Sequence, residues 1–591
     1  MKYINFYLPY IAFLFFTFLG LLAWDLIKIN SYPTQDFLRF YSFIVISLIP
    51  TYFFLRKYKK NIYSASEVLL LDTNIETSKS GINYVYYFII FIIILSFLTL
   101  DPEEFYNLDL YHDGLSLTPS MNYLLSKSIW KTSFIESGLY SSYKPLLIAF
   151  FINKLTIGSK FFITYLVIFL NKFLLVTLVK LILDKLNFST NYKIMFFISF
   201  SILVFSLTKY DGSTYFSERH FLYLVFFILV YFNFFYQNKR STYVSSFLLS
   251  ALSVLSIFWY FDIFLFINAS LFFYLLFLYF LKEIKKIKYL IFGLIFFTVL
   301  FLLLFPKNEL IYFVKNNYFI LFEINQFTSM EYPSPLKFDD GRAIKTLMLF
   351  PYSGLLLMII VMTKDYLISK EIRIFFIILF ISSLISFLYG LGRSDSYHII
   401  YSTGLLMFNL IFFHLFLLFF YMQKKQLLLN KSLSHPISFI LIIFLILYQI
   451  DFKKIKKINQ FNTNIENLIF SKDEIFLKGK NRDYLKLISY YNNILNPKDC
   501  VQIFTDETLV PYFLKRKTCT RYFFYHILES KKLQNDSINE LRKVMPKYIL
   551  YDSELFNFNF FKKLNVVNEF INSNYEFHEK YMHWTFFKLK T

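Results

Sequence analysis

Residues that can bind an anion or carry a proton stand together in one short polar segment. The segment GLGRSDSYHI, residues 390–399, interrupts two apolar runs and contains Arg393, Asp395 and His398. An arginine binds a phosphate through paired hydrogen bonds, and a histidine exchanges a proton near neutral pH. Charges beside a membrane span are costly, so we expect them to have a function. The alternative is a structural ion pair of Arg393 with Asp395, with His398 one turn further on.

Three longer loops also combine acidic with basic residues. Carboxylates can accept a proton from an attacking hydroxyl, while arginine and histidine can neutralise a departing phosphate. These loops contribute Asp109, His112 and Asp113 (residues 101–143), Glu218, Arg219 and His220 (residues 209–220), and Asp339, Asp340 and Arg342 (residues 307–345). Together with Arg393, the pattern favours group transfer from a lipid phosphate whose head lies at the membrane interface. A second interpretation of Arg219 is an anchor at the lipid headgroups.

The composition indicates a membrane protein with many spans. Hydrophobic residues make up 57% of the 591 residues, charged residues make up 17%, and the mean hydropathy is +0.49. A soluble domain does not need so many apolar side chains. The net charge of +21 does not predict a nucleic-acid partner, because the lysines cluster in short loops between apolar runs. The first run, 5–27, is too long for a signal-peptide core and is expected to remain as a span.

Thirteen apolar runs are each about long enough to cross or nearly cross a bilayer of ~30 Å. They lie at 5–27, 36–55, 84–100, 160–185, 192–208, 219–237, 244–260, 262–281, 288–305, 346–362, 373–391, 396–421 and 436–450. Basic loops favour the cytoplasm. The basic loops here are 56–60, 239–240, 282–288, 364–373 and 424–425. Simple alternation places all of them on one side, with the N-terminus inside and everything after residue 449 outside.

Two features do not fit this simple count. The segment 143–157 is apolar but short and carries Pro145 and Lys154. We expect a helix that lies in the outer membrane interface, where aromatic and lysine residues are favoured. Lys172 stands near the middle of the run 160–185. It is either a snorkelling side chain at a displaced span boundary or a buried functional cation, and the sequence leaves both open.

After residue 450 the chain becomes mixed and polar for roughly 140 residues, enough for one small globular domain. Its periodicity predicts a strand at 501–505, a helix at 533–544, a strand at 546–551 and a closing hairpin at 575–590. We therefore expect a polytopic α-helical membrane domain, 1–450, with an outer loop, 101–159. A small extracytoplasmic α/β domain, 451–591, is expected to follow.

The only two cysteines, Cys500 and Cys519, both lie in this C-terminal region. An oxidising compartment outside the cytoplasm would allow them to form a disulfide. Two free thiols are the alternative.

The arrangement resembles the GT-C superfamily of polytopic glycosyltransferases. These enzymes use polyprenyl-phosphate-linked sugars and include the protein mannosyltransferases and the bacterial aminoarabinose transferases that modify lipid A. The resemblance is carried by the acidic first loop LDLYHDG, the interfacial helix after it, the many spans, and the segments TDETLVPYFLKRKTCTRYFF and MPKYILYD. It implies a transferase in the plasma (inner) membrane that moves a sugar to a glycan, lipid or protein acceptor at the outer face.

The resemblance also implies roles for individual residues. In that family a carboxylate of the first outer loop acts as general base, a role that falls on Asp113, with Asp109 second and His112 beside them. The family's adjacent Asp-Glu pair is replaced here by His112-Asp113. This replacement leaves a divalent metal open, and no other cofactor is expected. Arg393, with Arg219 and His398, would hold the lipid phosphate.

Other functions compete with glycosyl transfer from a lipid phosphate. An O-antigen-type polymerase or ligase also uses an arginine at the outer face and a large outer loop, but its donor is a polymeric glycan. A lipid or polysaccharide transporter (flippase) would be expected to show internal repeats and ionisable residues at the bilayer midplane, whereas most charges here lie at one face. A non-catalytic scaffold is the remaining alternative.

The basic loops generate a direct test of the topology. A reporter fused after Lys425 is expected to be cytoplasmic, and one fused after Asn464 is expected to be outside. If both reporters lie on the same side of the membrane, the number of spans is wrong and the polar loops do not share a face.

Overall fold

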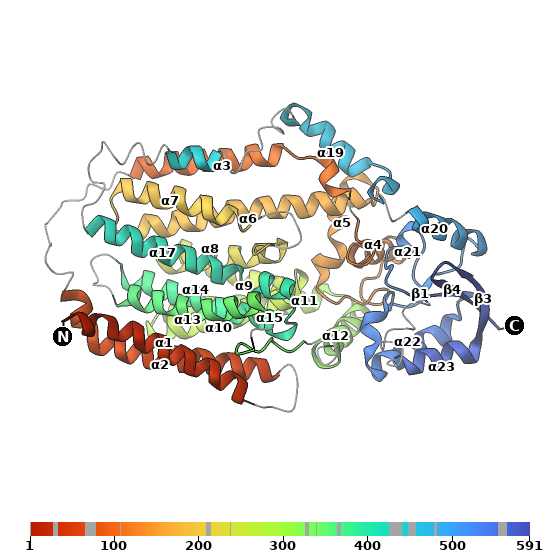
Figure 1. Ribbon diagram of the computed structural model, residues 1–591. Coiled ribbons are helices and arrows are strands. Elements are labelled where there is room, and N and C mark those ends of the chain that lie inside the picture. Colours follow the sequence, from red (N-terminus) through yellow and green to blue (C-terminus); the bar gives the residue numbers. More distant parts are fainter. Residues whose placement is uncertain are drawn as a thin grey trace.

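A bundle of long helices forms most of the molecule, and a smaller mixed region lies at one end of it (Figure 1). The computed structural model describes residues 2–27, 34–64, 79–106, 108–208, 214–236, 238–324, 330–337, 340–362, 368–424, 440–446, 457–477, 482–552 and 564–590. The bundle helices are α1 (Lys2–Leu26), α2 (Thr34–Ser64), α3 (Lys79–Leu98), α6 (Ile157–Lys185), α7 (Thr190–Phe205), α8 (Phe221–Phe235), α9 (Lys239–Leu255), α10 (Phe261–Phe280), α11 (Ile284–Leu304), α13 (Gly341–Val361), α14 (Lys370–Ser386) and α17 (Gly404–Lys424).

The multi-pass membrane fold predicted from the sequence is confirmed. Eleven helices within the described residues are long and apolar enough to cross a membrane, judged by length and composition. Helix α7 is apolar but has 16 residues, and it occupies the predicted run 192–208. The last predicted run, 436–450, lies mostly outside the described residues.

One predicted span boundary is wrong. The run predicted at 396–421 is divided between a short helix, α16 (Ser396–Ser402), and the candidate span that begins at Gly404. The side chain of Asp395 caps α16 by accepting hydrogen bonds from the backbone N–H groups of Tyr397 and His398. This cap starts a new helix outside the span, because it satisfies N–H groups that have no partner within the helix.

The first loop folds into two short helices, α4 (Gly114–Ser126) and α5 (Leu139–Ile152). Helix α5 has 14 residues and is therefore about 21 Å long at 1.5 Å per residue, less than the ~30 Å of a hydrocarbon core. It buries Tyr140 and Leu146 and leaves Phe150 and Phe151 exposed. Its predicted place in the membrane interface fits this length and stays a prediction.

The C-terminal region is a small α/β unit, as predicted. A four-stranded sheet has the order β1-β2-β4-β3, in which β1 pairs with β2 in parallel and the other pairs are antiparallel. The elements are α20 (Arg482–Ile494), β1 (Gln502–Phe504), α22 (Lys531–Val544), β2 (Tyr548–Asp552), α23 (Asn565–Asn574), β3 (Tyr575–Tyr581) and β4 (Trp584–Leu589). The predicted strands, helix and hairpin are confirmed at these positions.

The first loop and the C-terminal region share one hydrophobic core. Leu117 and Trp130 of the loop belong to the same buried cluster as Val510 and Leu550. Helix α4 approaches the C-terminal backbone so closely that a Cβ atom at its first residue, Gly114, would lie 2.0 Å from Thr508 Oγ1. The loop is therefore held by the C-terminal region as well as by the bundle.

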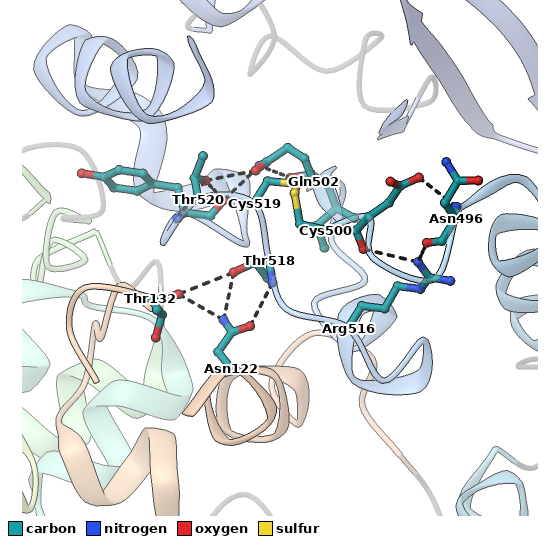
Figure 2. Close-up of a disulfide and its surroundings, with 12 residues drawn as sticks. Asn122, Thr132, Asn496, Cys500, Gln502, Arg516, Thr518, Cys519 and Thr520 are labelled. Carbon is teal, nitrogen blue, oxygen red and sulfur yellow. Dashed lines mark hydrogen bonds between the residues drawn. A yellow bond between two sulfur atoms is a disulfide. The ribbon is translucent and has the colours of Figure 1, made fainter. Parts of the chain in front are cut away.

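A disulfide and a buried amide lie side by side at this contact (Figure 2). Cys500 and Cys519 are bonded to each other. Beside them, Asn122 of α4 accepts the backbone N–H of Thr518 at 2.9 Å and donates to Thr518 Oγ1 at 2.9 Å. The same amide donates to the carbonyl of Thr132 at 3.1 Å. Asn122 thus connects the two halves of the shared core through buried hydrogen bonds.

Replacing Asn122 tests this connection. Asn122→Ala leaves the buried N–H of Thr518 without its acceptor, so we expect a loss of stability of about 1–3 kcal/mol. Thermal unfolding in detergent should show a lower Tm, and limited proteolysis should release the C-terminal region more readily. The control is Asn467→Ala, because the Asn467 side chain is exposed. Equal melting of the two variants would contradict the assignment.

Candidate active site

Polar residues from three of the four predicted loops meet at the end of the bundle that contacts the C-terminal region. Helices α4, α5, α12 (Lys307–Phe322) and α15 (Leu388–Gly392) lie toward that region in Figure 1. The contributions come from residues 101–143, from the described part of the second loop, and from residues 388–402. In the third loop, Asp340 caps α13 through the N–H groups of Arg342 and Ala343, and Asp339 lies outside the described residues.

Glu218 joins the first loop to the bundle. Its carboxylate accepts hydrogen bonds from Lys144 Nζ at 2.5 Å and from the hydroxyl of Tyr260 at 2.8 Å. The hydroxyls of Thr164 and Tyr140 also donate to it, at 3.1 and 3.3 Å. Lys144 and Tyr140 belong to α5, Thr164 belongs to α6, and Tyr260 immediately precedes α10. Because its donors are all from this framework, Glu218 has a structural role.

The next residue, Arg219, is a largely buried and rigidly held cation. Its guanidinium pairs with Asp262 at 3.2 Å, and its side chain is 14% exposed. The guanidinium carbon lies 4.6 Å from the ring centre of Tyr260 and 4.3 Å from that of Tyr389. Cation–π contacts of this kind are strongest where water is excluded. Arg219 is therefore fixed in the bundle end rather than extended toward lipid headgroups.

Arg393 and His398 both contact Asp395. Arg393 Nε donates to Asp395 Oδ2 at 3.1 Å, and His398 Nδ1 lies 2.7 Å from Asp395 Oδ1. Burial raises the pKa of Asp395, but the hydrogen bonds from His398 outweigh it and hold that pKa below its usual value. Burial lowers the pKa of His398. The ion pair expected as the structural alternative is thus present.

The pair with Asp395 occupies only one nitrogen of Arg393. Among the described residues, none hydrogen-bonds the two terminal guanidinium nitrogens of Arg393, and the side chain is 48% exposed. Two parallel N–H donors on an exposed guanidinium suit a phosphate. Arg393 can therefore bind an anion without giving up its contact with Asp395.

Asp109 and His112 form an exposed acid–histidine pair, called the Asp109–His112 dyad below. Asp109 Oδ2 lies 2.7 Å from His112 Nδ1, and Oδ1 accepts the N–H groups of Tyr111 and His112. Burial raises the pKa of Asp109, but the hydrogen bonds from His112 and Tyr111 outweigh this effect and lower the pKa to about 2. The His112 side chain is 73% exposed. With Nδ1–H donated to an anionic carboxylate, His112 Nε2 can accept a proton.

Asp113, in contrast, is buried and committed to the protein. Its Oδ1 pairs with Lys160 Nζ from the first turn of α6, and its Oδ2 accepts the N–H of Asp109 at 2.8 Å. These contacts connect the bend that carries the Asp109–His112 dyad to the bundle. The general-base role of Asp113 stays a prediction, and the geometry favours a positioning role.

Glu136 was not singled out from the sequence. It stands shortly before α5, and its charge interacts with Arg393, His526, Arg219 and His112. Burial raises its pKa. Residues far apart in the chain therefore share one electrostatic site around Glu136. A sequence signal exists, because Glu136 is the only acidic residue between Asp113 and Asp184.

The C-terminal region contributes a third acid–histidine pair to this site. His526 Nε2 lies 2.7 Å from Asp506 Oδ1, and the ring of His526 packs against Tyr111 with centres 5.0 Å apart. Thr508 Oγ1 donates to the carbonyl of Tyr111 at 2.6 Å. The C-terminal region thus forms one wall of the site.

The sequence left open whether a divalent metal binds, and the described part of the chain contains no obvious set of metal ligands. No group of three or more histidine, cysteine, aspartate or glutamate residues there is arranged to hold a metal ion.

The different surroundings of Asp113 and Asp109 predict different effects of the same substitution. Asp113→Asn removes the charge that pairs with buried Lys160. We therefore expect the free energy of unfolding to fall by about 3–5 kcal/mol and the Tm to drop clearly. Asp109→Asn changes an exposed group and should alter Tm little. If Asp113→Asn melted normally and lost ~10²-fold in turnover with donor binding intact, Asp113 would instead be the base.

Comparisons with known proteins give structural matches only. No protein-family model and no curated protein sequence matches the chain. The structure matches ArnT from Cupriavidus metallidurans bound to undecaprenyl phosphate, at 8% identity over 86% of this chain and 98% of that chain, with a TM-score of 0.45. It also matches the archaeal oligosaccharyltransferase AglB from Archaeoglobus fulgidus, in complex with an inhibitory peptide and a dolichol-phosphate, at 11% identity over 87% of this chain and 75% of that chain, with a TM-score of 0.35. These matches assign no residue of this chain a role.

Proposed function

We propose that this protein is a membrane glycosyltransferase that moves a sugar from a polyprenyl-phosphate donor to a hydroxyl-bearing acceptor. One observation carries the proposal. Glu136, at one end of a membrane bundle, interacts electrostatically with two exposed groups. One is the guanidinium of Arg393, which has free donors, and the other is the Asp109–His112 dyad, which is a proton acceptor. The first can bind a phosphate, and the second can activate an attacking hydroxyl.

The donor phosphate is held by Arg393, with Arg219 and His398 behind it. The terminal nitrogens of Arg393 donate to the phosphate, while Arg219, fixed by Asp262, supplies a second positive charge. A phosphate at this end of the bundle keeps its head in the polar interface and lets its prenyl chain lie along the apolar helices. Arg393 and Arg219 are called the phosphate clamp below.

The Asp109–His112 dyad receives the proton of the acceptor. His112 Nε2 takes the proton from the attacking hydroxyl, and Asp109 stabilises the imidazolium that forms. The acceptor oxygen bonds to the anomeric carbon while the bond from that carbon to the phosphate oxygen breaks. The bonding electrons leave with the phosphate, whose added negative charge the clamp neutralises. Asp113 positions the bend through Lys160.

The place of the reaction follows from the topology expected for the chain. The five basic loops predict that the C-terminal region lies outside the cytoplasm, and we therefore propose the outer face of the plasma (inner) membrane for this site. The acceptor is a glycan, lipid or protein that reaches this face. The large C-terminal wall of the site suits an acceptor that approaches from outside the bilayer.

Arg393→Lys tests the clamp, because lysine cannot copy a bidentate contact. We expect it to weaken binding of polyprenyl phosphate in nanodiscs by about 1–3 kcal/mol, the scale of a charge-assisted hydrogen bond, in a protein that melts normally. The matched control is Arg342→Lys, since Arg342 is exposed at the start of α13. Unchanged affinity with a lowered Tm would make Arg393 part of the architecture and remove the clamp.

The same preparation separates binding from proton transfer. His112→Gln should bind polyprenyl phosphate normally and lose ~10²-fold in transfer turnover. Normal turnover in this variant would exclude the dyad as base.

A further inference from the structure

The backbone on both sides of Glu136 is fixed to other elements. Asn316 of α12 accepts the N–H of Ile135 at 3.0 Å and donates to its carbonyl at 2.7 Å. On the other side, the carbonyl of Ser137 accepts the N–H of Phe261 at 2.9 Å. Gly138 has a φ of +135°, and a Cβ atom there would lie 2.5 Å from the carbonyl oxygen of Trp259. Glu136 therefore stands on a rigid segment.

Its carboxylate, however, has no fixed partner within the described part of the chain. No described residue gives Glu136 a hydrogen bond or an ion pair, although it is only partly exposed. Glu218, on the same end of the bundle, receives four donors. Since a partly buried carboxylate with unfilled acceptor positions is costly, a rigid one beside a candidate active site is suited to a ligand.

The charges around Glu136 indicate which part of a ligand reaches it. Glu136 interacts with Arg393 and Arg219 of the phosphate clamp and also with His112 of the Asp109–His112 dyad. In a displacement at the anomeric carbon, the departing phosphate and the attacking hydroxyl lie on opposite sides of that carbon. The sugar must therefore lie between the clamp and the dyad, and the charge of Glu136 interacts with both of them.

We propose that Glu136 binds the donor sugar by accepting hydrogen bonds from its hydroxyl groups. This inference rests on the proposed function and adds the sugar subsite to it. The favoured donors carry a neutral or an amino sugar with free hydroxyls. A uronic acid is disfavoured, because its carboxylate would face the carboxylate of Glu136.

The test compares two lipids in nanodiscs: polyprenyl phosphate alone and polyprenyl-phosphate hexoses carrying glucose, mannose or galactose. The wild-type protein is expected to bind at least one hexose donor more tightly than the bare phosphate. Glu136→Ala, and the isosteric Glu136→Gln to a smaller extent, should weaken binding of that donor by about tenfold or more and leave the bare phosphate within twofold. The control is Glu103→Gln, an exposed glutamate of the same loop.

Each contrary result has a distinct meaning. If Glu136→Ala, with a normal Tm, keeps the full preference for the hexose donor, the sugar subsite is wrong. If the variants bind both lipids normally and lose only turnover, Glu136 handles the proton and the sugar-binding role is also wrong. If Arg393→Lys leaves the binding of both lipids unchanged, the proposed function itself fails, whatever Glu136 does.

Discussion

The site depends on one largely buried carboxylate that accepts hydrogen bonds from several helices. Glu218 binds Lys144 of α5 and Tyr260 next to α10, and thereby holds the first loop against the bundle. A buried ion pair is tolerated when further hydrogen bonds complete it, and Glu218 has two more. The ring of Tyr260 also covers Arg219. The contact that anchors the loop therefore fixes the cation of the phosphate clamp as well.

The C-terminal region is a structural part of this site. Its core is continuous with that of the first loop, and Thr508 holds the backbone of Tyr111 inside the bend that carries the Asp109–His112 dyad. Asp506 and His526 of the same region form a pair, and the ring of His526 packs against Tyr111. The acidic loop and the mixed C-terminal segment are each weakly specific features of the sequence. They form one surface because each covers the apolar face of the other.

The sequence predicts local features well and long-range contacts poorly. The C-terminal strands and eleven of the thirteen predicted spans, one of them with a shifted boundary, were found as expected, because alternation and long apolar runs encode them. The pair of Asp395 with His398 was also foreseeable, because His398 follows Asp395 by three positions at a helix start. The burial of Asp113 depends on its ion pair with Lys160, 47 positions away in the sequence. The charge of Glu136 interacts with Arg393 and His526, which are also distant in the sequence. Spacing in the sequence predicts neither contact.

The most direct measurement is a structure of the protein in nanodiscs with polyprenyl phosphate bound. We expect the phosphate to contact the terminal nitrogens of Arg393 and to lie near Arg219, with Glu136 and His112 free to contact a sugar and an acceptor. The prenyl chain should run along the apolar bundle helices. A phosphate bound at the opposite end of the bundle, or away from Arg393 with the Asp109–His112 dyad out of reach, would contradict the proposed function.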